Sequence, residues 1–183
     1  MSVTLTPKCV AYLASEEGLT TEAYLDTGGV WTWGLGVTDA SGHEVSRYKD
    51  NPQPLAKVLD IGLWLIRQKY LPSVVEAFPG KVLNEAQTAA ALSFHWNTGA
   101  IKKAEWIKAF VRGESDAEAL IMEWSSHGLL TNRRKREQSL FFHGVWPANL
   151  SCSVYPVNPS NHHPLIYKGV KTDILPDLIK LMP

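Results

Sequence analysis

The sequence predicts an α+β fold, with a small N-terminal lobe built around a β-hairpin, a larger helical C-terminal lobe and a cleft between them. Two patterns carry this prediction. Residues 23–33 place strand-forming side chains on both sides of a glycine turn, as in a hairpin. Most later segments repeat apolar residues every three or four positions, as amphipathic helices do. At 183 residues, 45% of them hydrophobic, the chain can bury a sizeable core.

The small lobe is expected to contain one helix and the hairpin. Thr6-Pro7 is a predicted N-cap followed by proline at the first helical position, and Gly18 is well placed to end a helix over residues 7–17. Residues 23–25 and 30–33 are then the two strands of the hairpin, because they flank a glycine turn.

Four further helices are predicted. The apolar stripe of residues 55–71 indicates one, which we expect to be interrupted at Pro72. Capping boxes at Asn84–Gln87 and Ser115–Glu118 open two more, which should run to about residues 97 and 124. The arginine-rich segment 132–142 indicates the fourth.

From Pro147 onward several prolines predict an irregular extension. This extension is too rich in apolar residues for a solvated linker, so we expect it to pack on the core and to end in a short helix over 174–182. The predicted organisation is one domain over residues 1–146, whose small lobe covers about 12–55, and an extension over 147–183.

Charge and cysteine content narrow the classes of function. The net charge is zero, but residues 1–60 hold eight acidic and four basic side chains, while the remainder holds ten acidic and fourteen basic. This asymmetry fits either steering of an anionic polymer or an uneven surface without function. Cys9 and Cys152 match no metal or disulfide framework, and two buried free thiols are favoured over a single bridge. We see no signal peptide and no membrane span, so synthesis in the cytoplasm without stable membrane insertion is expected.

The segment EEGLTTEAYLDTGGVWTWGLGVT, Glu16 to Thr38, carries the candidate chemistry. A carboxyl at a helix end facing another on a hairpin is the arrangement that glycoside hydrolysis uses, with one carboxylic acid and one carboxylate. Glu17 at the helix C-terminus suits the acid, because the negative helix end disfavours the ionised form. Asp26 beside the glycine turn suits the carboxylate, and Thr32 on the returning strand could hold a water. The alternative is that both carboxylates are solvated surface charges.

The same segment resembles the active-site segment of the tailed-phage lysozymes, glycoside hydrolase family twenty-four. The shared pattern is Glu17-Gly18, Tyr24-x-Asp26, the glycine turn and Thr32-x-Gly34-x-Gly36, in the same order and at the same intervals. The resemblance implies a lysozyme-like fold in which Glu17 is the general acid, Asp26 the second carboxylate and Thr32 the third member of the catalytic set. Glu16 is then only a neighbour.

Two further segments support the resemblance, which spans about residues 5–146. Residues 93–99 resemble the turn that ends the family's central helix, and residues 132–141 its arginine-rich last core helix. We therefore predict that four residues contact the substrate: Thr38, Trp96, Asn97 and Arg133. Core packing is an equally open role for Trp96. Two departures are Val37, where the family usually has histidine, and the extension from Pro147.

Other motifs indicate no additional chemistry. Gly34-Leu35-Gly36 lacks the third glycine and the helix of a dinucleotide loop. His162-His163 has no accompanying ligands, so exposed histidines are favoured and no metal is predicted. The run Arg133–Arg136 is too short for a nucleic-acid interface.

The resemblance implies an N-acetylmuramidase that cuts the β-1,4 bond between N-acetylmuramic acid and N-acetylglucosamine by an inverting course, without a cofactor. The expected partner is the peptidoglycan glycan strand. We expect the protein to be a monomer that acts on this strand in the periplasm or cell wall. A phage endolysin dependent on a holin fits, as does a secreted antibacterial effector with an immunity protein. A wall-binding relative without catalysis is a third hypothesis, disfavoured because all three catalytic residue types are present.

Overall fold

The computed structural model describes residues 4–183 and consists of two compact units. The helical unit contains residues up to 13 and 67–149, and the sheet unit contains residues 14–66 and 150–183. One boundary falls within helix α1 (Pro7–Glu17) and the other follows Ile66. The small sheet and the mostly helical remainder confirm the predicted α+β class.

The sheet unit is built on one mixed sheet. Its strands follow the order β3-β2-β1-β4-β5, and they are β1 (Leu19–Leu25), β2 (Trp31–Gly34), β3 (Val37–Thr38), β4 (Cys152–Tyr155) and β5 (Val170–Thr172). β1 and β2 pair antiparallel with Tyr24 opposite Thr32 and Leu25 opposite Trp31, which confirms the predicted hairpin. Two short 3-10 turns, Asp39–Ser41 and Ser46–Tyr48, follow the β2–β3 ribbon.

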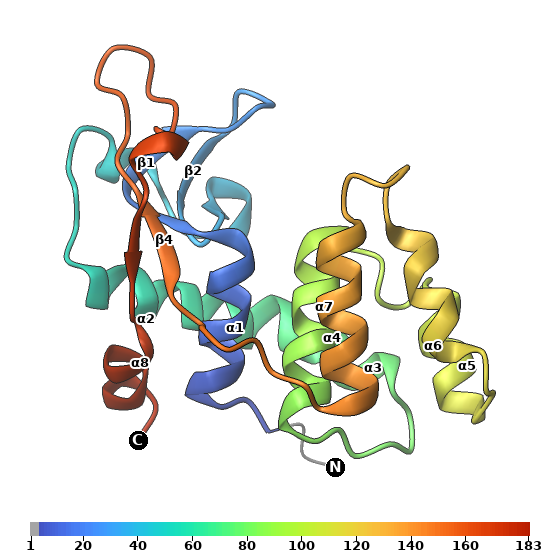
Figure 1. Ribbon diagram of the computed structural model, residues 1–183. Coiled ribbons are helices and arrows are strands. Elements are labelled where there is room, and N and C mark those ends of the chain that lie inside the picture. The colour runs from blue at the N-terminus through green and yellow to red at the C-terminus, as the bar shows by residue number, and fades with distance from the viewer. Residues whose placement is uncertain (1–3) are drawn as a thin grey trace. The chain divides into compact units, whose positions relative to one another are not determined.

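The C-terminal extension is more regular than the sequence predicts. β4 lies parallel to β1, and β5 lies antiparallel to β4, so that the extension contributes two strands to the sheet. Figure 1 shows the orange β4 beside the blue β1. The expectation of an irregular segment was wrong because a parallel pair joins strands that are distant in sequence, which no local pattern reveals.

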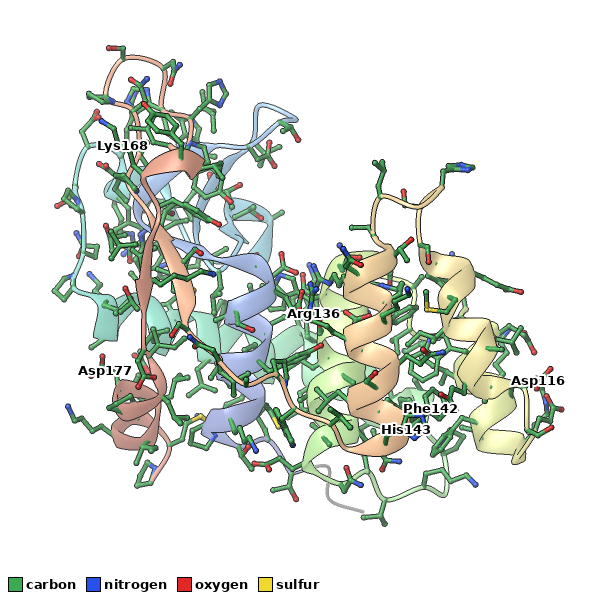
Figure 2. The ribbon with its side chains drawn as sticks, viewed as in Figure 1. Asp116, Arg136, Phe142, His143, Lys168 and Asp177 are labelled. Atoms are coloured by element: carbon green, nitrogen blue, oxygen red, sulfur yellow. The ribbon has the colours of Figure 1, made fainter. Side chains whose placement is uncertain are left out.

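The extension ends in helix α8 (Leu175–Leu181), which confirms the predicted short helix. α8 packs on α2 (Leu55–Leu65) in the same unit. Ile174 and Leu178 are fully buried. In Figure 2, Asp177 lies on α8, and Lys168 lies on the 3-10 turn Ile166–Lys168 between β4 and β5.

Helix α1 begins and ends as predicted, whereas the second helix continues beyond its predicted end. The Thr6 hydroxyl accepts the backbone N–H of Cys9 at 3.3 Å and caps α1. α2 passes through a wide helical turn, Ile66–Tyr70, directly into α3 (Leu71–Ala77). The predicted interruption at Pro72 is therefore wrong. Pro72 lies at the start of α3, directly after this wide turn.

The helical unit also contains α4 (Glu85–Thr98), α5 (Glu105–Arg112), α6 (Ala117–Leu120) and α7 (Thr131–His143). The capping box of α4 is confirmed, because the Asn84 side chain accepts the N–H of Gln87 at 2.9 Å and that of Gln87 accepts the N–H of Asn84 at 3.1 Å. The second box is wrong. The N-cap of α6 is Asp116 and not the predicted Ser115, and its side chain makes no cap bond. The segment is one α-helical turn followed by a 3-10 turn, Ile121–Trp124, which ends at the predicted residue. Helix α5 was not predicted.

Aromatic side chains form much of the core of the helical unit. Trp106 is fully buried and meets Phe94 and Phe141 edge to face, at centroid distances of 5.2 and 5.0 Å. This edge-to-face geometry suits the ring quadrupoles.

In residues 4–183 no helix has the length and apolar character needed to cross a bilayer. Cys9 and Cys152 are free and buried, as predicted.

Candidate active site

The candidate acid, Glu17, is the last residue of α1. The helix ends there because Gly18 takes a left-handed conformation, with φ of 72°, while its N–H still donates to Ala14 O at 2.8 Å. β1 begins at the next residue. The half-buried Glu17 side chain therefore lies where the helix passes into the sheet.

The second candidate, Asp26, occupies the turn between β1 and β2. Its Oδ1 atom accepts the backbone N–H groups of Gly28 and Val30, both at 2.8 Å, and its own N–H donates to Val30 O at 3.1 Å. Gly29 takes the left-handed conformation that closes the turn, with φ of 74°. Two backbone donors on one oxygen fix the direction of the carboxylate, and Oδ2 makes no hydrogen bond within the described chain.

The third candidate, Thr32, lies on β2 opposite Tyr24 and is 5% exposed. Its hydroxyl donates to Val30 O at 3.1 Å, which ties it to the same turn. Trp33, the next residue along β2, is fully buried and stacks on Tyr48 at 3.9 Å. This stacking packs Trp33 within the sheet unit.

Tyr24 links the two carboxylates electrostatically. Burial raises the pKa of its phenol, and the nearby charges of Asp26 and then Glu17 raise it further. Both carboxylates thus act on one half-buried hydroxyl group. The structure brings all three predicted catalytic residues into the sheet unit, around the start and end of β1.

Among the predicted substrate contacts, Thr38 belongs to the sheet unit. It pairs with Thr32 across β2 and β3. Its backbone N–H donates to the Ser41 hydroxyl at 3.3 Å, and the two hydroxyls are 3.4 Å apart. Thr38 is half-buried and directly beside the strand of a catalytic candidate.

Trp96 and Asn97 lie near the end of α4 in the helical unit. Trp96 is half-buried and stacks on Tyr70 with ring centroids 4.1 Å apart. The exposed Asn97 accepts a hydrogen bond from Arg134 Nη2 at 2.7 Å and borders an open depression of about 320 Å³. This depression also includes Trp124. The substrate roles of Trp96 and Asn97 stay predictions.

Arg133, the remaining predicted contact, is 8% exposed. Its Nε atom lies 3.1 Å from Glu137 Oε1, and its Nη2 atom donates to the Ser93 carbonyl at 3.0 Å. Arg134 Nε lies 3.2 Å from the other oxygen of Glu137. These contacts give Arg133 a structural role in joining α4 to α7, and its substrate role stays a prediction.

Sequence reasoning missed the contacts of His162 and His163. His163 is exposed, as expected, whereas His162 is half-buried. The Nε2 atom of His162 lies 3.0 Å from Asp50 Oδ1, and Nδ1 of His163 lies 3.0 Å from Leu25 O. The second contact joins residues 138 positions apart, so only the fold could reveal it. In residues 4–183 no three His, Cys, Asp or Glu side chains are grouped to hold a metal ion.

Comparison with solved structures finds the same fold in three lysozyme-type proteins. The endolysin of the Escherichia coli phage FAHEc1 has a TM-score of 0.69 and 22% identity, over 80% of this chain and 98% of that chain. The muramidase domain of SpmX from Asticaccaulis excentricus has a TM-score of 0.59 and 23% identity, over 77% of this chain and 99% of that chain. A mutant of the P22 lysozyme has a TM-score of 0.61 and 22% identity, over 77% and 98%.

Sequence comparison places the chain more directly. A search of curated proteins gave no match. The family model described as phage lysozyme matches residues 14–137, which include Glu17, Asp26 and Thr32 and end before the C-terminal extension. Since this match covers well over half of the chain and contains the whole candidate site, the chain belongs to the phage lysozyme family.

Proposed function

We propose that this protein is a muramidase that hydrolyses the β-1,4 bond between N-acetylmuramic acid and N-acetylglucosamine in peptidoglycan. The observation that carries the proposal is the placement of Glu17 and Asp26. One ends a helix, the other is fixed in a glycine turn, and both act on the phenol of Tyr24. Family membership supports a glycoside hydrolase, whose chemistry needs two carboxyl groups with different roles.

Glu17 is the general acid in this proposal, because the leaving oxygen must receive a proton as the glycosidic bond breaks. Asp26 and Thr32 then hold the attacking water. The bonds from Gly28 and Val30 to Asp26 Oδ1 leave Oδ2 as the oxygen that can accept a water proton. An inverting course follows from the resemblance to the family.

Replacement of Glu17 tests the proposal. Glu17→Gln keeps the shape of the side chain but removes the transferable proton, so lysis of permeabilised Gram-negative cells should fall by roughly 10²–10⁴-fold. Glu16→Gln is the matched control one position earlier and should keep wild-type activity. Near wild-type lysis by Glu17→Gln would show that the acid has been wrongly assigned.

The biological setting that we propose is a phage endolysin acting on the wall from the periplasm after release through a holin. The structural similarity to a phage endolysin supports this setting. We expect the protein to act as a monomer. In this role the neighbouring genes should include one that encodes a holin.

A second candidate, an antibacterial effector, is favoured by one observation. The FAHEc1 endolysin aligns over 98% of its own length but over only 80% of this chain, so part of this chain has no counterpart there. An effector would be encoded beside a secretion spike and an immunity protein. Finding that pair, and no holin gene, would replace the endolysin proposal without affecting the proposed chemistry.

A further inference from the structure

The C-terminal extension contacts β1 (Leu19–Leu25) near its start and again at its last residue, the one before Asp26. β4 pairs with the start of β1 in the register Leu19 opposite Val154 and Thr20 opposite Tyr155. Farther along, the backbone N–H of Val157 lies close enough to Glu22 to lower the pKa of its carboxyl, although burial and the charge of Asp50 raise that pKa overall. The extension therefore contacts the strand that joins the two candidate catalytic carboxylates.

The last of these contacts is made at Leu25, which immediately precedes Asp26. The N–H of Leu25 donates to His162 O at 2.7 Å, and Nδ1 of His163 lies 3.0 Å from Leu25 O. Because a carbonyl oxygen only accepts hydrogen bonds, His163 must carry a proton on Nδ1. Both backbone polar groups of Leu25 are thus bonded to the extension, while Asp26 itself is bonded across the turn to Val30.

The loop that makes these contacts, residues 156–165, is held by its own hydrogen bonds. Asn158 N–H donates to His163 O at 2.9 Å, and His162 N–H donates to Asn158 O at 2.8 Å. Leu165 N–H donates to Pro156 O at 2.8 Å. These bonds hold the backbone of the segment that carries His163.

The same loop also contacts the second strand of the hairpin. The ring of His162 lies edge-on to Trp31, with centroids 5.2 Å apart, and its Nε2 is 3.0 Å from Asp50 Oδ1. Trp31 precedes Thr32 in the sequence. The loop therefore contacts the residue before each of the two groups proposed to hold the attacking water.

We propose that loop 156–165 positions the Asp26 turn, with His163 as the positioning residue that acts through Leu25. This inference rests on the proposed function. Residues 27–30 of the turn are exposed and lie beyond the paired strands of the sheet. A catalytic group must be held within about 0.5 Å of its productive position, and the bonds at Leu25 restrain the end of β1 from which Asp26 extends.

The test compares His163→Leu with His163→Asn. Leucine removes the donor to Leu25 O, whereas the asparagine amide nitrogen can replace Nδ1 as the donor. On soluble peptidoglycan glycan strands, His163→Leu should lower kcat roughly tenfold or more with KM within about twofold of wild type, because the nucleophilic water is misplaced while binding is kept. His163→Asn should recover most of kcat. Wild-type kcat in His163→Leu, or an equal loss in both variants, would overturn the proposal.

Hydrogen exchange gives a readout that does not depend on activity. The N–H groups of Gly28, Gly29 and Val30 are all bonded to Asp26. In His163→Leu these amides should exchange roughly tenfold faster than in wild type, and in His163→Asn at nearly the wild-type rate. Unchanged exchange in His163→Leu would overturn the positioning role. A wild-type protein that cleaves no peptidoglycan would instead overturn the proposed function alone.

Discussion

The ring of Tyr155 lies directly against Gly18, the residue that follows Glu17. A Cβ atom at Gly18 would collide with this ring and would also lie 3.1 Å from the carbonyl oxygen of Ser153. Gly169 approaches the same ring, where a Cβ atom would lie 2.6 Å from Tyr155 Cε1. The extension therefore contacts the chain beside both candidate carboxylates, through Tyr155 at one end of β1 and His163 at the other.

Gly18→Ala should destabilise the protein more than an ordinary left-handed glycine replacement does. The φ of 72° costs an alanine roughly 1–2 kcal/mol, and crowding by Tyr155 adds about 1–3 kcal/mol. Gly80→Ala is the matched control, since Gly80 has φ of 74° and an added Cβ atom would have nothing within 4 Å. Chemical denaturation measures the free energy of unfolding of both variants. Equal losses in the two would show that Tyr155 yields without cost.

Asp26→Asn should lower lysis by roughly 10²–10⁴-fold while leaving the turn intact. The amide oxygen can still accept the N–H groups of Gly28 and Val30, but the side chain can no longer take a proton from water. The melting temperature provides the folding control.

In the wild type, freshly released sugar should have the α configuration, and a retained β configuration would contradict the inverting course.

Glu137→Leu should destabilise the helical unit by roughly 3–5 kcal/mol, because it leaves two buried guanidinium groups without their shared carboxylate. Glu118→Leu removes an exposed carboxylate, 2.7 Å from His143 Nε2, and serves as the control. It should cost at most about 1 kcal/mol. Urea denaturation measures the free energy of unfolding of both variants. Similar small losses in the two would contradict the structural role given to the cluster of Arg133, Arg134 and Glu137.

The thiol of Cys152 should make stability fall at alkaline pH. Burial raises its pKa from 9.0 to about 12, so the folded protein binds a proton that the unfolded chain releases. The contribution of the protonated thiol to the free energy of unfolding is complete below about pH 9 and is lost as the pH rises from 9 toward 12. Between pH 8 and 10.5 the melting temperature of the wild type should therefore fall further than that of Cys152→Ala. Parallel curves for the two proteins would refute this linkage.

Truncation before Pro147 should cost stability. It removes β4 and β5 from the edge of β1, together with the buried Ile174 and Leu178 of the α8 segment. Thermal unfolding of residues 1–146 should begin at a lower temperature than that of the full chain. Unchanged melting with full lysis would show the extension to be dispensable, whereas normal folding with lost lysis would indicate a substrate or docking role.

Local patterns determined the elements that depend on neighbouring residues. Thr6-Pro7 and Gly18 set the ends of α1, and the Asn84 capping box set the start of α4, because each signal acts through bonds within four residues. The spacing from Glu17 to Thr32 also identified the candidate catalytic set, since helix end, strand and turn follow one another without interruption.

Only the tertiary structure decided how distant segments meet. The parallel pairing of β4 with β1, the Tyr155–Gly18 contact and the His163–Leu25 bond join residues from opposite ends of the chain. Arg133 similarly resembles a surface arginine in sequence but is buried beside Glu137. These contacts form because the unsatisfied edge of β1 and the buried charges need partners, and the sequence near each residue does not specify which distant partner the fold supplies.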